Sequence, residues 1–321
     1  MIIRKLSSDF TPLHEGIFFG IESEDETPSD IIVEVLELPA GEVIATKLLH
    51  EVESATINIA PYVGHFVDYA PTSQRSTSFV TAPTASYKIR VNDIESEEVI
   101  VSVNRASIVS TPALIASMPN RRRVARGEND ELLIASCKGR RIYAEMVAEN
   151  GEMLHIDYMP TTDACTLIIS PDDFSPAVRE FDLTLFCDGA FLKSVHYTIA
   201  TPLRNSIRLA WLSASGAIER YTFPRSHKST VSVERKGLVT EDGPCNAHCR
   251  TREVASLCSR LEPHATIEAL AQIISAPKVW IERNGEFNLV EVETSSLVYD
   301  LFGEPSHIHL DVCLWQKEVA L

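Results

Sequence analysis

The sequence predicts a mainly β protein: two tandem antiparallel β-sandwich domains followed by an α+β domain with one helical pair. Apolar and polar residues alternate in short runs over most of the chain, and turn residues interrupt these runs about every eight to twelve positions. Helical periodicity is confined to the last third. A chain of 321 residues is longer than a domain with a single hydrophobic core usually is, so we place three domains, at 1–105, 106–203 and 204–321.

The composition is that of a folded protein, with 45% hydrophobic and 23% charged residues. A formal net charge of −16 argues against a general nucleic-acid binder, which needs a basic face. Residues 1–105 hold 7 Lys and Arg against 17 Asp and Glu, so we do not expect this part to bind nucleic acid or an anionic membrane. The seven cysteines are interpreted as free, mostly buried thiols in a reducing compartment.

The first two domains are predicted from alternating runs and turn residues. In 1–105, "SYKIRVND" places Tyr87, Ile89 and Val91 on one face of a strand. In 106–203, hairpins are expected around Glu149-Asn150-Gly151 and at Asp188-Gly189, because Asn-Gly and Asp-Gly favour the positive-φ turns that hairpins need.

The third domain combines strands with the helical pair. Strands are expected in "IRLAWLS", "AIERYTF" and "STVSVERK". Helical spacing of Val254, Leu257, Cys258 and Leu261 then predicts one helix, and Pro263 is expected to end it before a second helix over 267–274. A hairpin at Asn284-Gly285 and a last strand, "HIHLDVCLWQ", complete the domain.

Two groups of residues have the chemistry of metal ligands. The segment "CNAHC" contains Cys245, His248 and Cys249, but it lacks the C-x₂-C spacing of a structural zinc site. We interpret it as a loop leading into a helix. His307 and His309 share one face of the last strand, where an ordinary polar face is the favoured interpretation over a metal site. No metal and no cofactor are therefore predicted.

Two charged runs raise the question of a binding role. "RRRVAR" contributes Arg121, Arg122, Arg123 and Arg126, which suit an acidic protein partner, including another copy of this chain. A solvated loop between strands is the alternative. "ESEDE" at 22–26 lacks the glycine and ligand spacing of a calcium loop, so an exposed acidic turn is expected there.

No nucleophile elbow, zinc-protease, P-loop or dinucleotide motif occurs, and we predict that the protein is not an enzyme. A hydrolase hypothesis needs a pocket in which serine, histidine and aspartate converge.

A stretch at 208–224, "RLAWLSASGAIERYTFP", combines an apolar strand, a small-residue turn and an aromatic strand. It resembles the "L-x-W-L-N-x-x-G-x-x-x-x-x-F" signature of structural proteins from prophages and phage-tail-like elements of Bacteroidetes, with Ser213 where that family often has Asn. The segments "INIAPYVGHFV", "ISAPKVWIERNGEFNLVEVETSSLVYD" and "HIHLDVCLW" are similar to the same family. The signature positions in this chain are Trp211, Gly216, Phe223, Pro277 and Gly285.

The resemblance implies a non-enzymatic structural or assembly protein of a phage-tail-like particle or prophage. Its partners would be other structural proteins or further copies of itself, with no nucleic acid and no membrane span. The start lacks the apolar run of a secretory signal, so we expect a cytoplasmic protein, or one in a virion or tail-like particle after assembly. The alternative is a cell-surface adhesion or glycan-binding β-sandwich protein.

Overall fold

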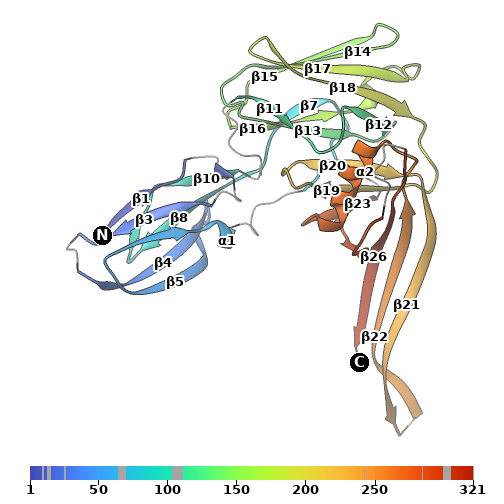
Figure 1. The fold of residues 1–321 in the computed structure, drawn as a ribbon. Helices are drawn as coiled ribbons and strands as arrows, with labels where there is room; N and C mark the ends of the chain where they lie inside the picture. Colours follow the sequence, from blue (N-terminus) through green and yellow to red (C-terminus); the bar gives the residue numbers. More distant parts are fainter. Residues whose placement is uncertain are drawn as a thin grey trace.

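The computed structural model describes residues 1–8, 11–12, 16–24, 27–63, 70–102, 111–241, 243–283, 285–298 and 305–320. Antiparallel sheets dominate it, and the prediction of a mainly β fold is confirmed. Three bodies of sheet follow one another along the chain, and from the third a long β-hairpin extends away from the rest (Figure 1). No described helix is long and apolar enough to cross a membrane.

The first unit is a sandwich of two sheets, ordered β1-β3-β6 and β2-β10-β8-β4-β5, with β9 paired to β8. Its elements are β1 (Ile2–Lys5), β2 (Thr11–Pro12), β3 (Phe18–Glu22), β4 (Ser29–Leu38), β5 (Glu42–Val52), β6 (Ser54–Asn58), α1 (Ala60–Val63), β8 (Thr84–Val91), β9 (Ile94–Glu95) and β10 (Val99–Ser102). Tyr87, Ile89 and Val91 are buried between the sheets, as their alternation predicts. The "ESEDE" run and "INIAPYVGHFV" both extend beyond the described residues, at 25–26 and 64–67.

The second unit is also a sandwich, with sheets ordered β11-β13-β16-β7 and β12-β18-β17-β14-β15. Its elements are β11 (Ala113–Ile115), β12 (Arg121–Ala125), β13 (Asp130–Ala135), β14 (Ile142–Ala148), β15 (Met153–Tyr158), β16 (Ala164–Ile169), the 3₁₀ turn η2 (Pro171–Asp173), β17 (Glu180–Cys187) and β18 (Ala190–Ala200). Both predicted hairpins are present. Asp188 and Gly189 have φ +49° and +80°, as a two-residue hairpin needs, whereas at 149–151 only the last residue of a three-residue loop, Gly151, has a positive φ, of +88°.

One strand departs from the predicted domain boundaries. β7 (Ser78–Thr81) lies within 1–105 in sequence, but it pairs with β16 and completes a sheet of the second unit. Phe79 stacks on Tyr158 with ring centroids 5.3 Å apart. Local alternation identifies a strand but not the sheet that it joins, which is why the sequence placed this segment in the first domain.

The third unit has two sheets, ordered β20-β19-β23-β24 and β21-β22-β26-β25. Its elements are β19 (Ile207–Leu212), β20 (Ile218–Phe223), β21 (Arg225–Thr240), β22 (Gly243–Cys258), α2 (His264–Ala271), the 3₁₀ turn η3 (Gln272–Ser275), β23 (Val279–Arg283), β24 (Glu286–Leu289), β25 (Glu291–Val292) and β26 (His309–Ala320). Trp211 and Phe223 are fully buried in its core, where α2 contributes Ile267 and Leu270.

The prediction of the first helix of the pair is wrong. Residues 254–258 are the end of β22, and Ala255 and Leu257 are buried at the two-residue spacing of a strand. Pairing with strands on both sides overrides the helical spacing of the same apolar residues. The second helix is confirmed as α2 continuing into η3, and Pro263 stands at the N-cap of α2 rather than between two helices.

Candidate functional site: the projecting β-arm

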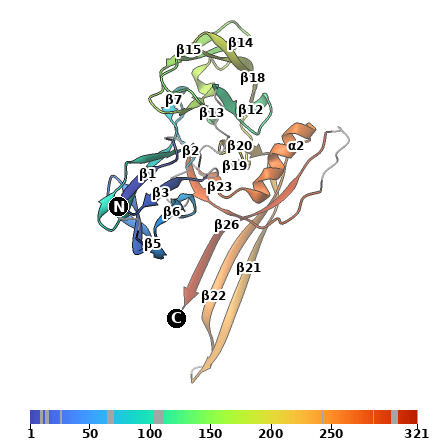
Figure 2. The same cartoon turned by 60° about the vertical axis from the view of Figure 1, so that its left-hand side comes forward.

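The feature with the clearest functional implication is the part of the third unit that extends beyond its core. We call it the arm: residues 228–254 of β21, the turn and β22, flanked by residues 315–320 of β26. Figure 1 and Figure 2 show the hairpin extending well past the body, with β26 beside β22. At about 3.3 Å per residue, a strand of 16 residues is about 50 Å long.

The arm has no core of its own. Between Lys228 and Val254 every described side chain is exposed or half-buried, and burial starts at Ala255 where the sheet enters the body. A few strands without a covering layer are marginally stable in water. A sheet of this length whose described side chains are all exposed or half-buried is therefore expected to gain stability from a surface outside its own chain.

The core side of the sheet continues onto the arm as a partly apolar strip. Ala255 faces the core, so its alternate neighbour Glu253 lies on the same side, with Val231 and Trp315 opposite it on the flanking strands. Val231 is 57% exposed and Trp315 39% exposed. The Trp315 indole N–H donates to the Glu253 carboxylate, which fixes the ring across the sheet.

The outer edge of β21 offers unpaired backbone. β21 is the last strand of its sheet, and along the described part of the chain only β22 pairs with it. Edge strands present rows of N–H and C=O groups to which another strand can add. From 228 to 240 this edge strand carries Lys228, Arg235 and Lys236 against a single acidic residue, Glu234, in a chain whose net charge is −16.

Most of the predicted basic loop is the strand β12, which Arg126 follows directly, and the four arginines differ in their surroundings. Arg121 and Arg123 are exposed, whereas Arg122 is buried and Arg126 donates to the carbonyl oxygens of Phe174, Ser175 and Val178 at 2.7–3.0 Å. Arg122 and Arg126 are thus held by contacts within their own chain. A contact of Arg121 and Arg123 with an acidic partner stays a prediction.

Arg122 instead joins the second unit to the third. Its guanidinium lies 2.9 Å from Asp130 on β13 and 3.3 Å from Glu219 on β20, and the Tyr197 hydroxyl donates to Asp130 at 2.8 Å. Burial acts to raise the pKa of Asp130, but Arg122 and the two hydrogen bonds hold it below its ordinary value. Burial raises the pKa of Glu219, where the charge of Arg122 opposes it. Sequence reasoning missed this network because Tyr197 and Glu219 lie far along the chain from Arg122 and Asp130.

A second buried pair lies beside the first. Arg220 is bonded to Glu131 and to the Asn129 side-chain oxygen, and it donates to the Thr72 carbonyl oxygen at 2.7 Å. Thr72 belongs to the segment that carries β7 into the second unit. The orientation of the second and third units is therefore fixed by paired charges in addition to apolar packing.

A cleft of about 680 Å³ lies between these two units. Arg122, Asp130, His196 and Glu262 are among its lining residues, and no serine or cysteine is among the described residues that line it. His196 already bonds Asp182 at 2.9 Å. Arg122 and Asp130 thus belong to the network that joins the two units, whereas His196 and Asp182 pair within one sheet of the second unit.

The predicted metal-ligand residues separate into two places. Cys245, His248 and Cys249 lie on the arm in β22, not in a loop, and pair with Leu238, Lys236 and Arg235 of β21. His307 and His309 lie at the base of the arm, where Cys258 of β22 faces His309 of β26. Cys258 reaches the histidines only through the register of β22 with β26, which a helix over 254–261 does not provide.

The signature positions are structural. Trp211 and Phe223 are fully buried, and Gly216 and Gly285 adopt φ +85° and +83° in turns. Only glycine takes such angles without strain. Pro277 is exposed in the turn before β23.

No protein-family model and no curated protein matches the chain. Among solved structures, the chain is similar to the FN1–FN3 domains of chicken CNTN1, at 9% identity over 79% of this chain and 91% of that chain, with a TM-score of 0.22. It is also similar to domains 4–9 of the surface layer protein SbsC, at 10% identity over 95% and 42% of the two chains and a TM-score of 0.21. A tetra-tandem repeat from the extending region of a large adhesion protein gives 9% identity over 99% and 89%, with a TM-score of 0.20. These likenesses are too weak to carry an argument about this chain.

Proposed function

We propose that this protein is a non-enzymatic structural protein that assembles with further copies of itself through the arm, as a component of a phage-tail-like particle. The observation that carries the proposal is that every side chain the structure describes from Lys228 to Val254 is exposed or half-buried. A sheet that reaches so far without covering either face has the form of an interaction element.

A second copy of this chain fits the arm by charge. The edge strand β21 is basic from 228 to 240, whereas residues 1–105 hold 7 basic against 17 acidic residues. Contact between the arm of one copy and the acidic first unit of the next joins two different surfaces. Such head-to-tail contacts close into rings or extend as filaments, depending on the rotation between copies.

The particle type rests on the resemblance of 208–224 and of the later hairpin to phage-tail-like structural proteins. The buried Trp211 and Phe223 and the positive φ of Gly216 suit the fold role that this resemblance implies. They position β19 and β20, and the chain then passes directly into β21 and the arm.

The assembly proposal is tested by light scattering of the full chain separated by size, over a wide concentration range. We expect mass to rise with concentration for the wild type, and Val231→Glu with Val239→Glu to weaken association, because both valines are exposed on β21 and the added negative charges would face the acidic first unit. The matched control is Met159→Glu, because Met159 is 63% exposed but lies in the second unit. A wild type that stays monomeric throughout would exclude self-assembly.

One observation favours a second function, a glycan-binding surface protein. Four aromatic rings form a row across the outer face of the second unit, with centroids 5.8–6.4 Å apart: His155, Tyr143, Phe186 and Phe191. Phe191 is 65% exposed. Rows of exposed rings offer flat apolar surfaces to which sugar rings can stack. Binding to a glycan array that is lost in Phe186→Ala would favour this function. If the wild type binds no glycan on the array, assembly is the one function that the structure supports.

A further inference from the structure

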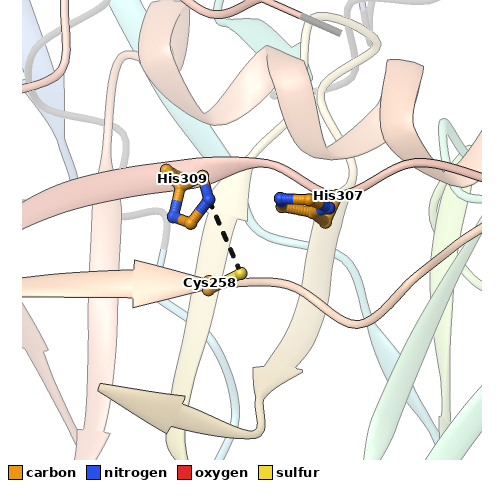
Figure 3. A group of neighbouring side chains, drawn as sticks. All are labelled: Cys258, His307 and His309. Carbon is orange, nitrogen blue, oxygen red and sulfur yellow. Dashed lines mark hydrogen bonds between the residues drawn. The ribbon is translucent and has the colours of Figure 1, made fainter. Parts of the chain in front are cut away.

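A compact group of metal-ligating side chains lies at the base of the arm, outside the surfaces discussed for assembly. Cys258 is the last residue of β22, and His309 is the first residue of β26, directly opposite it. His307 precedes His309 by two positions and points to the same side (Figure 3). The Cys258 Sγ lies 3.9 Å from the His309 Nε2, and the ligand atoms of all three residues lie within 4.8 Å of one another.

We propose that Cys258, His307 and His309 bind a divalent transition metal of the zinc type. Zinc–sulfur and zinc–nitrogen bonds of about 2.3 and 2.0–2.1 Å place two ligands of a tetrahedron about 3.4–3.6 Å apart. The observed separation of Cys258 and His309 is within a few tenths of an ångström of that value, so small side-chain rotations complete the set. Thiolate and imidazole ligands suit borderline metals such as Zn²⁺, whereas Mg²⁺ and Ca²⁺ prefer oxygen ligands.

The site has three protein ligands and one open position. His307 and His309 are exposed and Cys258 is half-buried, so the fourth position of the tetrahedron faces solvent. Water fills it in the simplest state, and a ligand from another molecule can replace that water. On binding, the Cys258 thiol releases one proton and the metal takes the thiolate, while both imidazoles bind in their neutral form.

The position of the site gives the metal a structural effect. Cys258 and His309 stand where β22 and β26 first pair, and the bridge between Glu262 and Ser306 lies just beyond them. A bound metal therefore fastens the start of the C-terminal strand to the hairpin that forms the arm. This inference does not depend on the function proposed for the arm.

The test is titration of the full chain with Co²⁺, which reports thiolate ligation by a charge-transfer absorption and tetrahedral geometry by its visible bands. We expect one equivalent to bind and Zn²⁺ to displace it. Cys258→Ser should abolish the charge-transfer absorption, and His309→Asn and His307→Asn should each weaken binding by more than about tenfold. Cys249→Ser is the matched control, because Cys249 is a half-buried thiol of the same strand, and it should leave the titration unchanged.

A wild type without thiolate absorption, or an equal absorption in Cys258→Ser, would overturn the proposal. Since a variant can also lose its fold, unfolding of the wild type is measured in parallel with Zn²⁺ and with a chelator. Zinc should raise the unfolding midpoint of the wild type and of Cys249→Ser, and the chelator should reverse the shift. A midpoint in wild-type protein that does not respond to Zn²⁺ counts against the site.

Discussion

The guanidinium of Arg122 lies 3.3 Å from the carboxylate of Glu219, and both side chains are buried where the second unit meets the third. Arg122 comes from β12 and Glu219 from β20, so the pair spans two bodies of the fold. Glu219 also accepts a hydrogen bond from the backbone N–H of Met118 at 3.2 Å. These contacts hold the body from which the arm projects.

Arg122→Met should destabilise the protein strongly. Removing one partner of a buried ion pair leaves the other charge uncompensated, which costs about 3–5 kcal/mol. Urea unfolding at neutral pH measures the change. The matched control is Arg141→Met, because Arg141 and Asp157 form an exposed pair 2.8 Å apart, and water screens such a pair so that its loss should change the unfolding free energy far less. Equal effects of the two substitutions would contradict the structural role of Arg122.

The contribution of Asp130 should depend on pH. Its pKa is lowered in the folded protein, so the carboxylate stabilises the fold above its unfolded pKa of about 3.9, and this stabilisation is lost as the pH falls through the folded pKa. The difference in unfolding free energy between the wild type and Asp130→Asn should therefore shrink on acidification below about pH 4.

Tyr197→Phe provides the control for this pH dependence. It removes the hydroxyl that donates to Asp130 at 2.8 Å, so it should raise the pKa of Asp130 in the folded protein and move the loss of stability to higher pH. A difference between wild type and Asp130→Asn that does not change with pH would show that Asp130 titrates alike in both states.

Two tryptophans of the third unit should respond differently to truncation. Trp211 is fully buried, so Trp211→Ala should cost about 3–5 kcal/mol of unfolding free energy. Trp315 is 39% exposed on the arm, so Trp315→Ala should cost much less stability and should instead weaken self-association. Urea unfolding and light scattering separate the two effects. A folded Trp211→Ala that loses only a partner would show that Trp211 belongs to a binding surface.

Salt should weaken self-association. The contact proposed between basic β21 and the acidic first unit is exposed, and charges in water are screened beyond about 8 Å at physiological ionic strength. Dissociation constants measured at rising sodium chloride should therefore increase. Association that strengthens with salt would point to an apolar contact through Val231 and Trp315 in place of the charged edge.

The sequence predicted local structure better than long-range pairing. The turns at Asn150-Gly151 and Asp188-Gly189 are predictable because one or two residues, Gly151 in the first and Asp188 with Gly189 in the second, supply the positive φ that each turn needs. The helix expected at 254–261 is a strand, because apolar spacing there satisfies two periodicities and only the flanking β21 and β26 decide between them.

The same limit applies to the sites. β7 joins a sheet that lies later in the chain, and Arg122 meets Glu219 across two units, so neither relationship leaves a local pattern. His307 and His309 were recognised from their alternation, but Cys258 reaches them only through the pairing of β22 with β26. The arm exists because β21, β22 and β26 stay paired well beyond the core, and the sequence of any one of these strands does not show how far the pairing extends.

Amide hydrogen exchange of the full chain at low and high protein concentration tests the central claim most directly. If copies associate through the arm, amides between Lys228 and Val254 should become protected as concentration rises, while amides of β14 and β17 in the second unit should not change. Arm amides that exchange at the same rate at every concentration, in protein shown to associate, would contradict the account.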